Sequence, residues 1–352
     1  MWKATCVLAL LAVTAAPAAA QDYTVVTVCH TDNKVAEVDP ITGKTLKQFI
    51  VPGQWTGETH EGAITRDGKT MFVSTPYAKQ VVILDLETFK QKGKIESEYF
   101  SRPPEVRSFA RIGQRESTSA DPHGVALSND ESKLYVTVEF GEVPGVVVYD
   151  LKTRKSKKID TVVAGNWLGV HPRTDKLYVP NRMAADNVTV IDTKTDRILR
   201  VIPHQAGSRP AGVAFGGPNG EVWVSGDGDG SVTVIDSATD KVIKVIQPRI
   251  KGAGRIAVSP DGHFAAAAQG KEVSIIDTRT KEIVASLSIS PAGMEGGHGY
   301  PVFSPDSNTL HVINESSNDM ATFDMRNMKA PAKRSAPIGG ASFGGGIRQL
   351  RR

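Results

Sequence analysis

The stretch VTVIDTKT, residues 188–195, decides the fold of this protein. It has the composition of a short β-strand, which ends at Asp192 and leads into a polar turn. Similar stretches recur along the chain as KVAEVDPITG, VVILDLET, VVVYDLKT, VTVIDSAT, VSIIDTRT and MATFDMRN. Seven copies at a period of about 44 residues indicate a repeat architecture, because one such unit could not bury its own apolar face.

An aspartate ends the apolar strand in each copy, and a Thr, or Asn in the last copy, follows three positions later. These aspartates are Asp39, Asp85, Asp150, Asp192, Asp236, Asp277 and Asp324. Asp and Thr side chains close local turns onto backbone amides, so the pattern is typical of hairpins and needs no catalytic explanation. The alternating β-branched residues exclude a helical repeat. The sequence therefore predicts an all-β protein, a seven-bladed β-propeller with four-stranded antiparallel blades.

The first copy begins at YTVVTVCH and lacks the strand that precedes it in the other copies. The segment IGGASFGGG, residues 338–346, supplies a candidate at the other end of the chain. We expect it to pair with the N-terminal strand and close the ring, since an open propeller would expose two sheet edges. The propeller would then span residues 21–346, and residues 347–352 would form a solvated basic tail.

The first twenty residues combine a lysine, an apolar run and a small-residue end at Ala18-Ala19-Ala20, which predicts a signal peptide over residues 1–20. No later segment is apolar for long enough to span a membrane. These features predict a periplasmic or secreted protein. Only Cys29 remains after cleavage, so no internal disulfide is expected. The net charge of +4 is too small to indicate a nucleic-acid partner.

The repeat period breaks once, between Asp85 and Asp150, where about twenty extra residues enter within 96–120. This insertion carries Arg102, Arg107, Arg111 and Arg115. Two interpretations stay open. The insertion could cover the channel as a lid, or it could be a solvated loop without a ligand.

The stretches KLYVTVEF, KLYVPNRM, EVWVSGDG and MFVSTPYA each precede a VTVIDT-like strand, and RIAVSPDGHF and VFSPDSNTLHV add an S-P-D signature. With these motifs the whole mature chain resembles the YVTN-repeat propellers. The resemblance implies a seven-bladed propeller of secreted or periplasmic proteins. Similar propellers include binding proteins, lactonases and lyases, quinoprotein subunits, zinc chaperones and copper enzymes, so the fold alone does not choose a function.

Aligning the innermost strands places His60, His123 and Asn166 at one register facing the channel mouth, with His298 one residue earlier. An acidic residue shortly precedes each histidine and could orient its imidazole: Glu58, Asp121 and Glu295. Three converging imidazoles suit zinc or copper, so His60, His123 and His298 are the predicted metal ligands. The chain has no C-x-x-C-H motif, from which no haem c is expected.

The same mouth could instead hold an organic or anionic ligand. The residues expected to contact such a ligand are Asn166, Trp167, Arg209, Arg255 and Tyr300. If the protein is an enzyme, His123 or Glu61 is the candidate general base.

Three functions follow from these expectations. The first is a periplasmic binding protein that holds a small molecule or a transition metal at the channel mouth. The second is a metal-dependent enzyme of the lactonase, lyase or copper oxidoreductase type. The third is a scaffold that binds a periplasmic protein partner.

Overall fold

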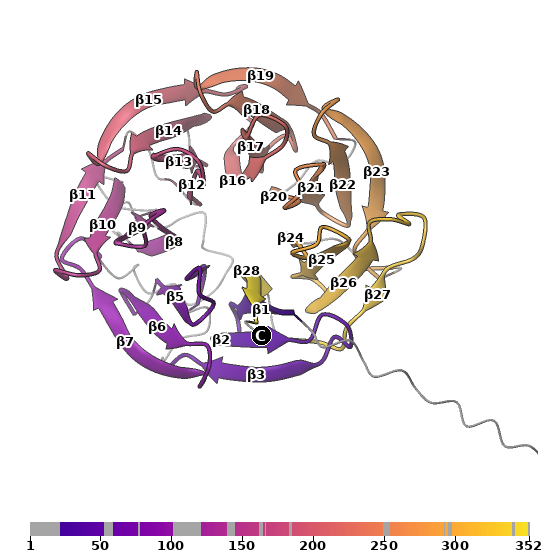
Figure 1. The fold of residues 1–352 in the computed structure, drawn as a ribbon, viewed down its shortest axis with the longest axis horizontal. Coiled ribbons are helices and arrows are strands. Elements are labelled where there is room, and N and C mark those ends of the chain that lie inside the picture. The colour runs from indigo at the N-terminus through magenta and orange to yellow at the C-terminus, as the bar shows by residue number, and fades with distance from the viewer. Residues whose placement is uncertain are drawn as a thin grey trace, which may run out of the picture.

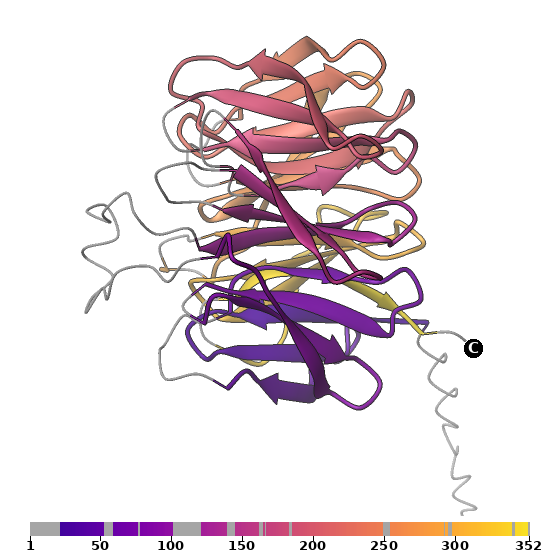
Figure 2. The same cartoon turned by 90° about the vertical axis from the view of Figure 1, so that its left-hand side faces the viewer.

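The computed structural model describes residues 22–52, 59–76, 78–100, 121–138, 145–161, 165, 167–182, 185–248, 254–291, 293–294, 298–339 and 342–350. These residues form seven four-stranded antiparallel sheets arranged in a ring, and they contain no helix. Figure 1 looks down the central axis, and Figure 2 shows the same ring from its side. The predicted seven-bladed β-propeller is confirmed.

Each blade is one sheet, and the blades are numbered here from the one that contains β1. The first blade contains β28 (Ser342–Gln349), β1 (Tyr23–Cys29), β2 (Lys34–Val38) and β3 (Thr45–Ile50). The second contains β4 (Gly62–Ile64), β5 (Thr70–Thr75), β6 (Gln80–Asp85) and β7 (Lys90–Glu96). The third contains β8 (Pro122–Leu127), β9 (Lys133–Val138), β10 (Gly145–Asp150) and β11 (Ser156–Asp160). The fourth contains β12 (Gly169–Val170), β13 (Lys176–Asn181), β14 (Asn187–Asp192) and β15 (Arg197–Pro203).

The remaining three blades complete the circle back to the first (Figure 1). The fifth contains β16 (Pro210–Gly216), β17 (Glu221–Gly226), β18 (Val232–Asp236) and β19 (Lys241–Ile246). The sixth contains β20 (Gly254–Val258), β21 (Phe264–Gln269), β22 (Glu272–Asp277) and β23 (Glu282–Ser288). The seventh contains β24 (Gly299–Phe303), β25 (Thr309–Asn314), β26 (Asp319–Asp324) and β27 (Lys333–Arg334). The first strand named in each blade is innermost.

The aspartates that end the third strands form the predicted turns. Asp192 Oδ1 accepts hydrogen bonds from the backbone N–H groups of Lys194 and Thr195 at 2.9 and 2.7 Å. The corresponding carboxylates of the other blades make similar bonds, which removes any need for a catalytic role. The aspartates that recur in the repeat therefore stabilise its hairpin turns.

The apolar core lies between blades and not within them. Seven clusters of buried side chains are found among the described residues, and each combines residues of two neighbouring blades. One of them joins Val25 and Val38 of the first blade to Tyr300 and Ile313 of the seventh. Each blade therefore depends on both of its neighbours to bury its faces.

The ring closes through the pairing of β28 with β1, from Tyr23 opposite Gln349 to Cys29 opposite Ser342. This confirms the predicted closure, but it corrects the predicted tail. Residues 347–349 belong to β28, and Arg348 is only 8% exposed. Its Nη1 donates to Glu37 Oε1 at 2.6 Å and its Nε to the Gly68 carbonyl at 2.8 Å. A buried carboxylate on β2 thus holds this basic residue inside the sheet.

Two expectations on domain organisation lie largely outside the described residues. These are the signal peptide over 1–20 and the insertion within 96–120, of which only 96–100 is described. At its start, Phe100 is buried against the core between the second and third blades. Among the described residues no helix has the length and apolarity required to cross a membrane.

Replacing Arg348 with alanine should lower the free energy of unfolding by about 3 kcal/mol or more, because Glu37 would stay buried without its main partner. Urea denaturation of both proteins measures this difference. Arg326→Ala is the control, since Arg326 pairs with Asp324 on the exposed surface and its loss should change the free energy of unfolding far less. Equal losses in the two variants would contradict a special role for the buried pair.

Candidate functional site

The innermost strands converge on the central channel, and the residues at their starts surround its mouth (Figure 1). His60 lies two residues before β4, and His123 is the second residue of β8. Their ring centroids lie 3.6 Å apart with an angle of 42° between the ring planes. The structure therefore brings together two of the three predicted metal ligands.

Hydroxyl groups on the neighbouring strands fix how these innermost strands begin. Thr137 Oγ1 accepts a hydrogen bond from the Gly124 amide at 2.7 Å, and Ser74 Oγ accepts one from the Glu61 amide at 2.9 Å. In β8 the pairing register also shifts between Pro122 and Val125. A bulge of this kind redirects a side chain, which explains how His123 turns toward His60 and Trp167.

His30 is a third imidazole at this mouth that the sequence analysis did not include. It is 8% exposed, its ring centroid lies 5.2 Å from that of His60, and its Nδ1 lies 2.5 Å from the Thr59 carbonyl. It follows β1, whose last residue Cys29 pairs with Ser342 at the start of β28. The end of the second strand of a blade thus reaches the same mouth as the start of the innermost strand. This rule could have identified His30 from the sequence.

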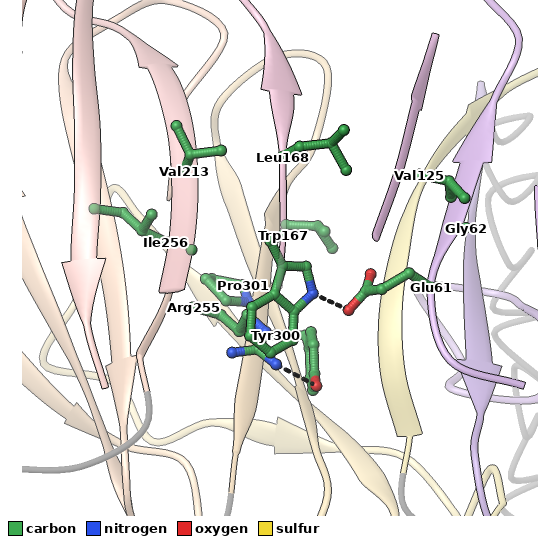
Figure 3. Close-up of a pocket in the computed structure, with 12 residues that line it drawn as sticks. Glu61, Gly62, Val125, Trp167, Leu168, Val213, Arg255, Ile256, Tyr300 and Pro301 are labelled. Atoms are coloured by element: carbon green, nitrogen blue, oxygen red, sulfur yellow. Dashed lines mark hydrogen bonds between the residues drawn. The ribbon is translucent and has the colours of Figure 1, made fainter. Parts of the chain in front are cut away.

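Figure 3 shows a stacked group of side chains that includes Trp167, whose ring lies beside the imidazoles of His60 and His123. The Arg255 guanidinium carbon is 3.1 Å from the ring centroid of Trp167 and 4.8 Å from that of Tyr300. Arg255 Nη2 donates to the Tyr300 hydroxyl at 3.0 Å. At the indole edge, Trp167 Nε1 donates to the carboxylate of Glu61. The structure therefore unites Glu61, Trp167, Arg255 and Tyr300, all of them predicted site residues, from four blades.

These four residues line one end of a cavity of about 230 Å³. Branched apolar side chains from five successive blades form much of the remaining wall. They are Val125, Leu168, Val213 and Ile256 (Figure 3), together with Val302. Such a cavity combines a few converging polar groups with an apolar lining, as ligand sites do.

Glu61 has an unusual environment for a carboxylic acid. Burial raises its pKa from 4.5 to about 7, although the charge of Arg255 and the hydrogen bond from Trp167 both act to lower it. The group therefore changes its protonation state near neutral pH. A titration in this range is what a general acid or base requires, as the sequence analysis expected of Glu61.

Two predicted site residues do not join this group. His298 Nδ1 lies 2.5 Å from Glu315 Oε2, and the Glu315 side chain is 24% exposed. Burial raises the pKa of Glu315, but the hydrogen bond and charge of His298 and the charge of Arg255 together bring it below its usual value. No group of three or more His, Cys, Asp or Glu side chains in the described part of the chain could hold a metal ion. The first blade separates His298 from His60, which explains why the predicted three-imidazole centre does not form there.

Arg209 also lies apart from the cavity. Its side chain is 48% exposed, and it shares Asp227 with Arg182. Arg182, which sequence reasoning missed, lies with its guanidinium carbon 5.9 Å from the Trp167 ring centroid. Asp121 is 1% exposed, whereas Glu58, Asn166 and Glu295 fall outside the described residues.

The family model of the cytochrome D1 heme domain matches residues 123–269. No curated protein matches the chain. A solved structure of Kuenenia stuttgartiensis hydrazine synthase is similar with a TM-score of 0.65 and 20% identity over 77% of each chain. A protein of unknown function from Desulfotomaculum acetoxidans is similar with a TM-score of 0.71 and 14% identity, over 93% of this chain and 99% of that one. These two structures support the propeller fold.

The match to a haem domain contradicts the expected cofactors, zinc or copper without haem c. The error has a physical cause. A missing C-x-x-C-H motif bears only on covalent attachment through cysteines, whereas many haems are held by an axial side chain and by packing. The resemblance to YVTN-repeat proteins stays a prediction.

Replacing Glu61 with glutamine should change how stability depends on pH. Unfolded Glu61 ionises above pH 4.5, but the folded side chain keeps its proton up to about pH 7. Unfolding therefore releases a proton within this window, and stability conferred by the protonated form is lost as the pH rises from 4.5 to 7. The free energy of unfolding of Glu61→Gln, relative to that of the wild type, should therefore rise by up to ~3 kcal/mol between pH 4.5 and 7.

Urea denaturation of both proteins at pH 5, 6, 7 and 8 measures this difference. Glu315→Gln is the matched control, because the pKa of Glu315 is lowered and its titration lies below this range. Parallel stability curves for wild type and Glu61→Gln between pH 5 and 8 would contradict the assigned titration.

Proposed function

We propose that this protein binds a haem-type tetrapyrrole, without a covalent bond, at the mouth of its propeller channel. The observation that carries the proposal is the pair of imidazoles of His60 and His123, in contact at 3.6 Å beside the ring of Trp167. The similarity to the cytochrome D1 heme domain supports it, and the matched residues begin at His123.

The donor set of the mouth suits a haem. An imidazole is a common ligand of haem iron, and the imidazole of His123 is only 5% exposed. The flat indole of Trp167 lies 5.8 Å from the His123 ring centroid and suits the face or edge of a macrocycle. His60 and His123 therefore offer the imidazole that would hold the iron, with Trp167 as an adjacent wall.

The volume of the cavity determines which part of such a ligand can enter it. Pockets for drug-sized ligands are commonly about 300–1,000 Å³, whereas the described cavity has about 230 Å³. It therefore accepts a substituent of a tetrapyrrole and not the whole macrocycle.

A bound haem would supply electron transfer or ligand exchange at its iron. The chain itself contributes position and exclusion of water. The hydroxyl of Thr137 accepts a hydrogen bond from the amide of Gly124, and this fixes the backbone next to His123. Trp167 and Arg255 are both buried where they line the adjoining cavity. The imidazoles and the adjoining cavity also suit other small ligands that carry an iron or an acidic group. Among such ligands, haem has the most support.

Titration of the purified protein with ferric protohaem IX should give saturable binding and a shifted Soret band. Replacing both His60 and His123 with alanine should weaken binding by about tenfold or more and alter the spectrum, because no imidazole would remain there to hold the iron. His263→Ala is the matched control, since its side chain is 76% exposed and lies in an ion pair with Asp261. Wild-type affinity and spectrum in the double variant would overturn the proposal, as would the absence of saturable binding to wild type.

A further inference from the structure

Arg255 carries a buried positive charge whose hydrogen bonds are incomplete among the described residues. The residue is 6% exposed and projects from β20 into the cavity (Figure 3). Nη2 donates to the Tyr300 hydroxyl, and Nη1 makes a long contact of 3.4 Å with the Gly254 carbonyl. Among the residues that the structure describes, none accepts a hydrogen bond from Nε. Leaving a buried guanidinium N–H unsatisfied is costly, so this edge of Arg255 is suited to an acceptor from outside the protein.

The aromatic neighbours compensate the charge only in part. The rings of Trp167 and Tyr300 lie 3.1 and 4.8 Å from the guanidinium carbon and stabilise it through cation–π contacts. Neither ring supplies a hydrogen-bond acceptor for Nε. The carboxylates of Glu61 and Glu315 attract Arg255 at longer range, but Glu61 accepts its hydrogen bond from the indole N–H of Trp167 and Glu315 is hydrogen-bonded to His298. A bound anion could therefore serve as the close ion-pair partner of Arg255.

The rest of the cavity has the opposite chemistry. Leu168, Val213 and Ile256 line the wall on one side of Trp167 (Figure 3). These side chains offer no hydrogen bonds and favour hydrocarbon over water. A ligand that fills the space must therefore combine an anionic head with a short apolar chain.

We infer that this cavity binds a carboxylate carried on a short apolar chain, with Arg255 as its ion-pair partner. A planar carboxylate matches the guanidinium fork, which can donate from Nε and one Nη together. The volume of about 230 Å³ restricts the chain to a few carbon atoms. The carboxylate belongs either to a free short-chain acid or to a propionate-like side chain of a larger ligand such as a haem. The inference goes beyond the proposed function, because the free acid requires no haem.

Calorimetric titration of the purified protein with butanoate and with its neutral analogue butanamide tests the first source. Butanoate should bind about tenfold or more tightly than butanamide, and Arg255→Gln should lose this preference. Arg209→Gln is the matched control, because Arg209 is half exposed and paired with Asp227 outside the cavity. It should bind butanoate as wild type does.

Protohaem IX and its dimethyl ester test the second source. If the carboxylate belongs to a haem, esterification should weaken binding about tenfold or more in wild type and have no effect in Arg255→Gln. A preference for the free acid in either pair of ligands supports the inference and identifies the source. Equal binding of acid and neutral analogue in both pairs, or an unchanged preference in Arg255→Gln, overturns it, as does the absence of binding by all four ligands.

Tyr300→Phe provides an independent test if Arg255→Gln does not fold. This change keeps the ring that packs on Arg255 and removes only the hydroxyl that accepts from Nη2. The guanidinium loses an anchor, so the preference for butanoate or for free haem should fall several-fold. An unchanged preference would contradict the assigned role of Arg255. The haem test of the imidazole pair uses the Soret band of the His60 and His123 variant, so the two proposals can fail separately.

Discussion

The pairing of β28 with β1 is the constraint on which the rest of this structure depends. Each apolar cluster lies between two blades, so no blade can bury both faces until the ring is complete. The closing strand is also fixed by a buried ion pair, between Arg348 and Glu37. The channel is a consequence of this closure. Its imidazoles and its stacked aromatic group come from different blades, and they meet only because the last residues of the chain join the first.

The repeat predicted the fold because its signals are local. An aspartate three positions before Thr closes a turn by its own hydrogen bonds, as Asp192 does, whatever the rest of the molecule does. The tail was misjudged for the opposite reason. Whether Arg348 is solvated depends on Glu37, a residue 311 positions away that no local pattern connects to it. Composition alone treats every basic terminal residue as a surface residue.

The candidate site was predictable to the extent that strand register determines direction. Register placed Glu61, His123, Trp167 and Arg255 near the channel, and these residues do contact one another or a shared neighbour. Register does not determine which partner a side chain selects. His298 begins beside its innermost strand as expected, yet it turns to Glu315 and not to the other imidazoles. His30 was missed because the alignment considered only the starts of innermost strands, although antiparallel pairing brings the ends of second strands to the same mouth.

Trp167 connects the two chemical halves of the mouth. One part of its ring faces His60 and His123, at centroid distances of 6.4 and 5.8 Å, and its face stacks on Arg255. Its N–H binds Glu61, whose pKa near 7 is set by the burial that the same indole helps to produce. A shift of this ring would therefore change the environment of the imidazoles, the guanidinium and the carboxyl group together. Because all of these contacts share one indole, a ligand that displaces the ring changes the surroundings of both halves of the mouth.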